Sequence, residues 1–339
     1  MEEPAARQDN LPTIASNTAF AMMARGRSAV PLAAPSYPEF PDKGIRLTAQ
    51  MLSFNAKQKP RDLGMGFYKT NGNRYQLSFL YDCSIDSSLG VSLSYLDTDV
   101  KSLHNDFRVK NTVTGYEASA DYDGFLMGKF PMRGSAFYGR ADTKTDGHIM
   151  AGGFGVPTPL AWHEDRHRST LYGFSGRIGV PLLYGDDIKF MPELGFHYAQ
   201  LRSRSYDVAV ANAAAPLRMP SQRSSTFTIP LTATVKRDFL HCWGLITPKI
   251  TGGIVRELSD KAAAFNGYNG SAATRMYYDG PTGIASEPGY DKAAKWSWHV
   301  GVGVDVKTVG GWEVSADYRR NWSEKYGGNE FKLELARCF

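Results

Sequence analysis

The chain has 339 residues and a formal net charge of +5, and apolar side chains make up 42% of it. This composition, with a mean hydropathy of −0.35, excludes a helical membrane protein, because no run approaches the roughly 20 apolar residues that a spanning helix needs. The mild charge, without a Lys/Arg run, gives little support to nucleic-acid binding. A membrane β-barrel stays open, since its strands alternate apolar and polar residues and average out to a polar composition.

The sequence shows no sign of a cofactor site or of a targeting segment. Residues 1–10 are acidic and have no apolar core, so they do not form a secretory signal peptide. If the protein is exported, we expect this chain to be a fragment, a processed product or a sequence without its true start. Cys83, Cys242 and Cys338 are far apart and belong to no Cys/His cluster, so the sequence predicts isolated thiols and no metal site or cofactor.

Residues 1–42 differ in composition from the rest of the chain and form the first predicted unit. Leu11–Val30 is rich in helix-forming residues, Asp9 or Asn10 is a candidate N-cap, and Pro31 ends the predicted helix. A Pro-rich linker comes next, and a disordered tail is the alternative interpretation. The centre of the predicted helix contains Ala19, Phe20, Met22 and Met23.

The second predicted unit, residues 43–339, has a period of two, which is typical of strands. In Trp296–Lys307, for example, Trp and Val alternate with small and polar residues. Many of the predicted strands have ten or more residues, which is longer than usual in soluble sheets and matches the ~9 to 11 residues that cross a bilayer at a tilt. The twelve predicted strands are Gly44–Phe54, Arg74–Asp82, Leu89–Asp97, Thr112–Tyr122, Met132–Ala141, Arg168–Val180, Ile188–Arg202, Ser224–Arg237, Leu245–Glu257, Trp296–Lys307, Trp312–Trp322 and Glu330–Phe339.

The predicted connections alternate between short and long. Those after every second strand are short, such as Thr308–Gly311, whereas the others are longer, such as Thr98–Asn111 and Leu258–Lys295, and only the last of these is brief. Outer-membrane barrels show this alternation because their periplasmic turns are tight and their extracellular loops long. A soluble sandwich with Greek-key connections is the alternative. The sequence favours an all-β fold, a transmembrane antiparallel β-barrel of about 12 strands.

If the apolar faces of these strands meet lipid, the opposite faces line the interior. Two interpretations of the interior stay open: ion pairs that stiffen a wet lumen, or a surface that contacts a translocating segment or a solute. Lys332 and Glu334 of the last strand fall on this face as well. The predicted pore-lining residues are Glu117, Asp121, Arg177, Glu193, His197, Lys249, His299, Asp305, Glu313, Asp317 and Arg319.

The best candidate for catalysis is the run His163-Glu164-Asp165-Arg166-His167 in a long connection. Acidic residues beside histidines can activate water for peptide cleavage, as at the rim of omptin-like surface proteases, but a run of polar residues in a loop is also simply solvated. The chain contains no Gly-x-Ser-x-Gly, no His-Glu-x-x-His and no phosphate-binding glycine loop. We therefore predict no enzyme and assign no catalytic residue.

The last ten residues combine strand alternation with a terminal aromatic residue. Together with the twelve strands and the helix-forming segment before them, they make the chain resemble the C-terminal translocator domain of the classical autotransporters, the type V secretion systems. Leu89–Tyr95 and Pro192–Tyr198 add to the resemblance, whereas Arg337 stands where that family has an aromatic or aliphatic residue. The terminal alternation is formed by Phe331, Leu333, Leu335 and Phe339.

The resemblance implies an integral outer-membrane protein that exports or displays an N-terminal passenger through or beside its pore. Leu11–Val30 then takes the position of the pore helix, and the terminal aromatic strand is the signal read by the barrel-assembly machinery. The implied partners are outer-membrane lipid, that machinery with its periplasmic chaperones, and the chain's own passenger, with the barrel a monomer. Some members cleave themselves in the pore, but Asn10 and Asn17 are not adjacent to another Asn, and we predict no cleavage. A porin-like passive channel and a barrel-rim protease are the alternatives.

Overall fold

The computed structural model describes residues 44–58, 67–84, 87–104, 107–149, 161–164, 167–184, 188–210, 217–219, 221–258, 296–323 and 326–339. The first predicted unit, with the helix expected at Leu11–Val30, lies outside these residues. Within the described part, no helix is long and apolar enough to cross a membrane.

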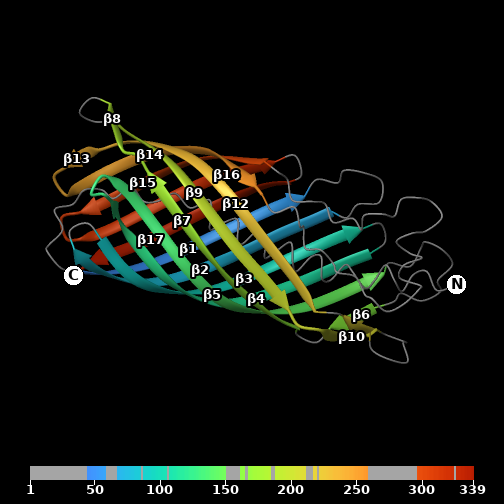
Figure 1. Cartoon of the computed structure of the whole chain (residues 1–339). Coiled ribbons are helices and arrows are strands. Elements are labelled where there is room, and N and C mark those ends of the chain that lie inside the picture. The colour runs from blue at the N-terminus through green and yellow to red at the C-terminus, as the bar shows by residue number, and fades with distance from the viewer. Residues whose placement is uncertain are drawn as a thin grey trace.

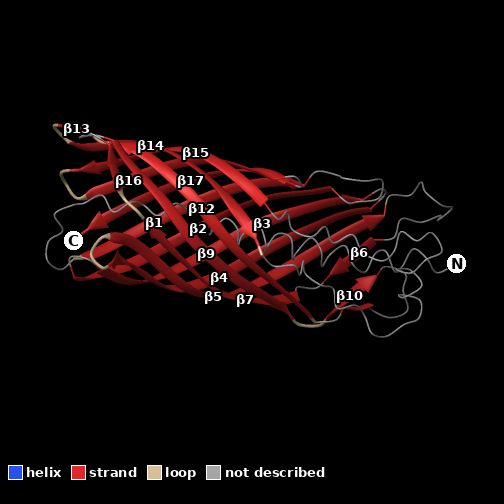
Figure 2. Cartoon of the chain, turned by 45° about the horizontal axis from the view of Figure 1, so that its top comes forward, coloured by secondary structure: helices blue, strands red, loops and turns tan. Residues whose placement is uncertain are grey.

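Twelve long strands close into one antiparallel barrel (Figures 1 and 2). This confirms the predicted all-β fold, with a strand at each predicted place. The barrel is closed by β1 and β17, which pair from Arg46–Cys338 to Gln58–Tyr326. In barrel order the long strands are β1 (Ile45–Gln58), β2 (Phe67–Ser84), β3 (Ser87–His104), β4 (Phe107–Leu126), β5 (Phe130–Ile149), β7 (His167–Gly179), β9 (Ile188–Ser203), β12 (Gln222–Arg237), β14 (Gly244–Glu257), β15 (Trp296–Thr308), β16 (Trp312–Ser323) and β17 (Tyr326–Cys338).

Short strands extend the barrel wall at both ends. At one end β6 pairs with β5 and β10, and β10 pairs with β11. At the other end β8 pairs with β9, and β13 pairs with β14. These strands are β6 (Ala161–Glu164), β8 (Leu182–Tyr184), β10 (Tyr206–Val210), β11 (Leu217–Met219) and β13 (Phe239–His241).

The two ends of the barrel differ in the length of their connections. The end where β1 begins and β17 ends carries tight turns, such as 127–129 between β4 and β5 and 309–311 between β15 and β16. The opposite end carries the longest connection, between β14 and β15. Because outer-membrane barrels turn tightly on the periplasmic side, the first end is periplasmic and the second extracellular.

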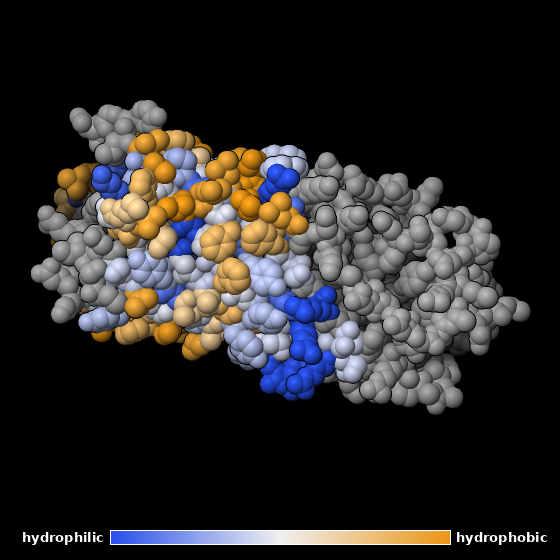
Figure 3. All heavy atoms as spheres, viewed as in Figure 1, coloured by the Kyte–Doolittle hydropathy of each residue, from blue (hydrophilic) through white to orange (hydrophobic). Residues whose placement is uncertain are grey.

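The outer surface carries many exposed large apolar side chains, and on the face in view in Figure 3 they form an apolar band, the orange and tan residues over the strands. Leu77 and Leu93 are each 67% exposed, and Tyr116 is 69% exposed. Soluble monomers rarely expose apolar patches of this extent. The band is therefore the surface that faces lipid, and polar residues face the other way.

One predicted connection is wrong. Thr98–Asn111 is not a long loop, because β3 and β4 continue through most of it and only residues 105–106 separate the two strands. Here the alternation is inverted: Val100 and Val113 are completely buried, whereas Lys101 and Lys110 are exposed. A search for strands with apolar residues outside and polar residues inside does not detect a segment whose outer face meets water. We call this part of the barrel the extracellular extension.

Candidate functional site

The lumen is the candidate functional site, and each long strand supplies every second residue to it. On strands β14 to β17 and β1 many of these inward residues are charged or polar. The register brings Lys249, Gly303, Asp317 and Lys332 into one row of directly paired residues across four strands. A neighbouring row contains Asp305, Ser315, Glu334 and Gln50. We call these two rows the inner polar belt.

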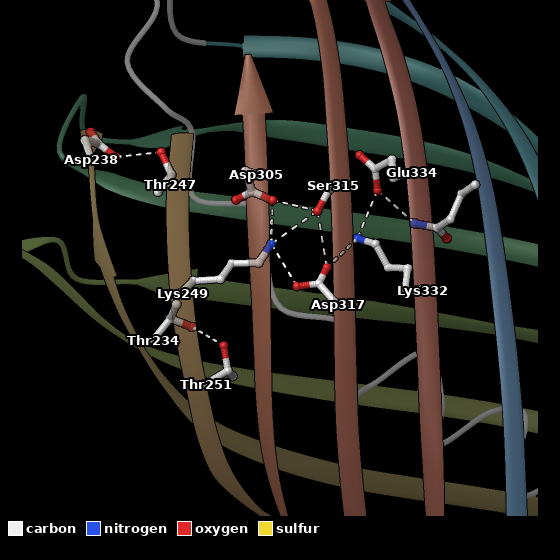
Figure 4. Close-up of polar contacts among 11 residues, drawn as sticks. Thr234, Asp238, Thr247, Lys249, Thr251, Asp305, Ser315, Asp317, Lys332 and Glu334 are labelled. Atoms are coloured by element: carbon white, nitrogen blue, oxygen red, sulfur yellow. Dashed lines mark hydrogen bonds and ion pairs between the residues drawn. The ribbon is translucent and has the colours of Figure 1, made fainter. Parts of the chain in front are cut away.

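Lys249 is the centre of the inner polar belt (Figure 4). Its Nζ lies 2.7 Å from Asp305 Oδ1 and 2.9 Å from Asp317 Oδ1, and the Lys249 side chain is only 10% exposed. Ser315 Oγ donates to Asp305 Oδ1 over 2.6 Å. One buried ammonium is thus shared by two carboxylates from two neighbouring strands, which fixes the position of three strands relative to one another.

Gly303 provides the space that this ion pair needs. It lies in the row between Lys249 and Asp317, and a Cβ atom there would lie 2.1 Å from Asp317 Oδ1 and 2.7 Å from Lys249 Cε. Any larger residue would separate the two charges. Gly303, a small residue in the Trp/Val alternation of β15, is therefore needed for the Lys249–Asp317 ion pair to form in the lumen.

The inner polar belt continues across the seam that closes the barrel. Lys332 Nζ lies 2.9 Å from Glu334 Oε2 and 3.7 Å from Asp317 Oδ2. Gln50 Nε2 donates to the same Glu334 oxygen over 3.0 Å. Since Gln50 belongs to β1 and Glu334 to β17, this bond supplements the backbone ladder with a side-chain contact inside the lumen.

A second polar cluster lies on β2, β3 and β4. Arg74 Nη2 donates to Glu117 Oε1 at 3.1 Å and to Ser94 Oγ at 2.9 Å. Asp121 accepts hydrogen bonds from Ser92 and Ser119, the latter over 3.0 Å. The structure therefore separates the predicted pore-lining residues into groups: Glu117 and Asp121 belong to this cluster, not to the belt around Lys249.

Toward the extracellular end, the inward residues include apolar side chains beside polar ones such as Thr98 and Asn111. A cluster of seven buried residues, which we call the apolar lumen patch, spans β3, β4, β5, β7 and β9. The Phe137 ring stacks on His197 with centroids 5.8 Å apart and an interplanar angle of 10°. Gly173 makes room for it, since a Cβ there would lie 2.6 Å from Phe137 Cζ. The patch consists of Val100, Val113, Phe137, Ala141, Leu171, Ala199 and Leu201.

The remaining predicted pore-lining residues also lie on the inner face of their strands. Arg319 Nη1 lies 3.4 Å from Glu330 Oε2, and Glu313 Oε1 lies 2.6 Å from Lys307 Nζ. Glu193, His197 and His299 are at most 2% exposed, and Arg177 is half-buried. Their burial fits the inward face, but the role of all eleven as a pore lining stays a prediction.

Gln50, Arg133 and Asp123 contribute to the lumen and were not singled out in the sequence. Gln50 was not singled out, although it shares the face of Leu52, which is buried. Arg133 and Asp123 form an ion pair between β5 and β4, with Arg133 Nη2 donating to Asp123 Oδ2 over 2.8 Å. The sequence contained the information needed to find them, because each of these residues falls on the inward-facing side of the alternation in its strand.

The remaining residues singled out in the sequence are those of the predicted helix and the run at 163–167. Residues Ala19, Phe20, Met22 and Met23 lie outside the described part of the chain. The run at 163–167 is divided: Ala161–Glu164 forms β6, residues 165–166 are not described, and His167 begins β7 with 2% exposure. Among the described residues, no group of three or more His, Cys, Asp or Glu is arranged to hold a metal ion.

The predicted assembly signal faces outward on β17 and at the chain end. Phe331, Leu333 and Leu335 are each 40–44% exposed, and Phe339 is 61% exposed. The arginine that departs from the family pattern fits among them: Arg337 Cζ lies 4.8 Å from the Trp312 ring centroid and 4.9 Å from that of Phe339. Arg337 thus covers two aromatic faces at the periplasmic edge of the apolar band.

Comparisons with known proteins agree with this architecture. The barrel is similar in structure to the translocator domain of the autotransporter NalP from Neisseria meningitidis, with a TM-score of 0.65 and 17% identity over 95% of this chain and 97% of that one. It is also similar to the beta domain of the Bordetella autotransporter BrkA, with a TM-score of 0.59 and 14% identity over 88% of this chain and 100% of that one. At these identities the two structures show the fold alone. No curated protein sequence matches the chain.

The family assignment comes from the sequence itself. The model of the autotransporter beta-domain matches residues 52–319, which contain almost all of the barrel. The lumen with its inner polar belt is thus the interior of a translocator. The chain belongs to the autotransporter beta-domain family and is an integral outer-membrane translocator and anchor.

Proposed function

We propose that the passenger segment before β1 reaches the cell surface through this lumen, and that Leu11–Val30 occupies the lumen as a helix. The observation that carries the proposal is the position of β1. Ile45, near its start, exchanges backbone hydrogen bonds with Phe339, the N···O distances being 3.2 and 2.9 Å. The segment before β1 therefore starts from the periplasmic end, and the lumen is the direct route to the other side.

The size and the chemistry of the lumen support this occupant. Twelve strands enclose room for about one helix, because barrel diameter grows with strand number. Leaving the apolar lumen patch wet would cost about 25 cal/mol per Å² of apolar surface. Ala19, Phe20, Met22 and Met23 are the matching apolar residues, and the eleven predicted pore-lining residues supply polar contacts around them.

The two alternative functions have less support. A porin-like channel needs an open, polar lumen along its whole length, whereas the apolar lumen patch interrupts the polar lining. For a rim protease, His163 and His167 would have to act together, but His167 is buried at the start of β7. Translocator domains of this family are typically not enzymes, and we assign this chain no catalytic residue.

Assembly follows from the outer face of the last strand. In this proposal Phe331, Leu333, Leu335 and Phe339 form the signal that the barrel-assembly machinery reads after periplasmic chaperones have delivered the chain. The exposure of these four side chains supports this role, because the barrel-assembly machinery can contact them before the barrel is inserted into lipid. In this proposal the barrel acts as a monomer, which is supported by the closure of the long strands that the structure describes into one sheet without a long free edge.

The test is the single-channel conductance of the refolded barrel in a planar bilayer. The full chain is compared with a variant that lacks residues 1–41. We expect a low conductance that rises on deletion, because the segment that fills the lumen has been removed.

A matched variant keeps the full length and changes the apolar face of the predicted helix, as in F20D/M23D. It should raise the conductance as well, because two carboxylates do not bind against the apolar lumen patch. A large conductance that is the same in all three proteins would contradict the proposal and favour a porin.

A further inference from the structure

A row of arginines crosses the outer surface of the barrel where the apolar band ends. Direct backbone pairing places Arg140 of β5 opposite Thr170 of β7, Thr170 opposite Arg202 of β9, and Arg202 opposite Arg223 of β12. All three arginines are exposed. Figure 3 shows a strongly hydrophilic cluster beyond the apolar band, at the place where Figure 1 shows the extracellular ends of β9 and β12. We call Arg140, Arg202 and Arg223 the arginine row.

The arginine row lies at the level of lipid headgroups. On the same outer faces, Arg140 follows Tyr138 by two residues, Arg202 follows Tyr198 by four, and Arg223 precedes Phe227 by four. A strand rises about 3.3 Å per residue, and a tilt of about 40° shortens the vertical step. The Cα atoms of the three arginines therefore lie about 5–10 Å beyond those of these aromatics, close to the interfacial layer of about 5–8 Å on each side of a bilayer.

The charges of this row are not balanced by nearby carboxylates. Within the part of the chain that the structure describes, none of the three arginines makes an ion pair, whereas the adjacent Arg168 Nε lies 3.1 Å from Asp142 Oδ1. Arg202 and Arg223 are direct cross-strand partners, and like charges in such a position destabilise a sheet. An anion between them would turn this repulsion into attraction.

One of the arginines is held in place by a polar contact on the lipid-facing side. Gln200 is only 2% exposed, and its Oε1 accepts hydrogen bonds from Arg223 Nη2 and from the Tyr198 hydroxyl, both at 2.9 Å. This contact fixes the orientation of the Arg223 guanidinium, whose other N–H groups can donate to an external acceptor. Such a planar donor group matches the oxygens of phosphate and of carboxylate in a bidentate geometry.

The neighbouring wall provides an internal comparison. Above the apolar band, the outer faces of β3, β4 and β5 mix both signs of charge. Lys110 Nζ lies 3.4 Å from Asp99 Oδ2, and Lys144 Nζ lies 3.9 Å from Asp146 Oδ2. Arginines without an ion pair among the described residues therefore lie side by side on β5, β9 and β12, whereas Lys110 and Lys144 of the neighbouring wall have carboxylate partners.

From this geometry we propose that the arginine row binds the phosphate groups of the glycolipid headgroup in the outer leaflet of the outer membrane. The inference rests on the outer-membrane location and orientation of the barrel, not on the route of the passenger. The row attaches one side of the barrel to the leaflet through charge-assisted hydrogen bonds, whereas the mixed-charge wall on β3, β4 and β5 faces water.

The test measures lipid binding by native mass spectrometry on the refolded full chain in detergent micelles. The probes are diphosphoryl lipid A, lipid A with both phosphates removed, and inorganic phosphate as a competitor. The variant is R140Q/R202Q/R223Q, and the matched control is K101Q/K110Q/K144Q, which removes the same number of positive charges from the neighbouring wall. Heat-modifiable migration on a gel establishes that each protein is folded.

We expect the unmodified barrel to bind the diphosphoryl form about tenfold more tightly than the form without phosphates, as one net charge-assisted contact would give. The arginine variant should lose this preference and the lysine control should keep it. If the triple variant does not fold, R202Q alone should lower the preference for the diphosphoryl form, because Arg202 and Arg223 then no longer bind a phosphate together. Equal loss in both triple variants, no preference in the unmodified barrel, or displacement of the lipid by inorganic phosphate would each overturn the inference.

Discussion

The lower and upper parts of β3 and β4 differ in the character of their outer faces, and the upper part also buries apolar residues on its inner face. In the lower part, Leu93 and Tyr116 are exposed on the outside while Ser94 and Glu117 face the lumen. In the upper part, the extracellular extension, Val100 and Val113 face inward while charged residues face outward. The backbone is the same continuous ladder in both parts. The two parts differ in the medium on the outside, lipid below and water above, and the inner face of the upper part combines Val100 and Val113 with polar residues such as Thr98 and Asn111.

This difference predicts that the two parts of the lumen respond unequally to the same chemical change. A buried charge is tolerated where the inner polar belt supplies partners, and it is not tolerated in the apolar lumen patch. Substitutions in both parts test this difference, in order of decreasing effect. The free energy of unfolding is obtained in each case from urea titration of the barrel refolded in detergent micelles.

Val113→Asp should have the largest effect. The side chain is completely buried in the apolar lumen patch, so a carboxylate there has neither water nor a cation beside it. We expect a loss of more than about 4 kcal/mol, which places it among the strongest point substitutions. Val113→Ala is the control and should cost about 2 kcal/mol for the lost packing. Similar losses in both variants would mean that this part of the lumen is wet.

Lys249→Met should cost about 3 kcal/mol, because it leaves the partly buried Asp305 and Asp317 without their shared cation. Lys332, 3.7 Å from Asp317, compensates part of the loss. The triple variant K249M/D305N/D317N removes the unpaired charges and should recover much of the stability. If the triple variant is no more stable than Lys249→Met, the belt does not act through charge pairing.

Gly303→Ala should cost about 1–2 kcal/mol, because the new methyl group displaces the Asp317 carboxylate while Asp305 still holds Lys249. The effect is smaller than that of Lys249→Met, since one of the two ion pairs survives. Gly252→Ala on the neighbouring strand is the matched control: its Cβ would meet only the His299 carbonyl oxygen, at 3.9 Å. Equal effects of the two substitutions would show that lost glycine flexibility, not crowding, is the cause.

Gln50→Ala should have the smallest effect, about 1 kcal/mol, the net value of one hydrogen bond. Its effect should be local, because the bond from Gln50 to Glu334 joins the two strands that close the barrel. We expect faster hydrogen exchange of β1 and β17 amides and unchanged exchange in β4 and β5. Thr48→Ala, an inward residue of β1, is the control. Uniformly faster exchange in all strands would show that the seam is not a separate weak point.

Much of this molecule could be read from the sequence. Strict alternation in β15 and β12 predicted strands and their lipid-facing sides, and the order of short and long connections predicted which end faces the periplasm. The extension of β3 and β4 was missed because its pattern has the opposite sign. Gln50 was missed because a single amide in an alternating strand carries no sign that its partner is 284 residues away.

The sequence by itself determined the strand period, the number of strands and the face of each strand that meets lipid, because these depend on local alternation. Only the tertiary structure decided which inward residues meet. Closing the barrel fixed a register that places Gly303 between Lys249 and Asp317, gathers the apolar lumen patch on one wall and sets Arg202 opposite Arg223. Register is a property of strand pairing, and a shift of two residues would keep the pattern of the sequence while changing every contact in the lumen.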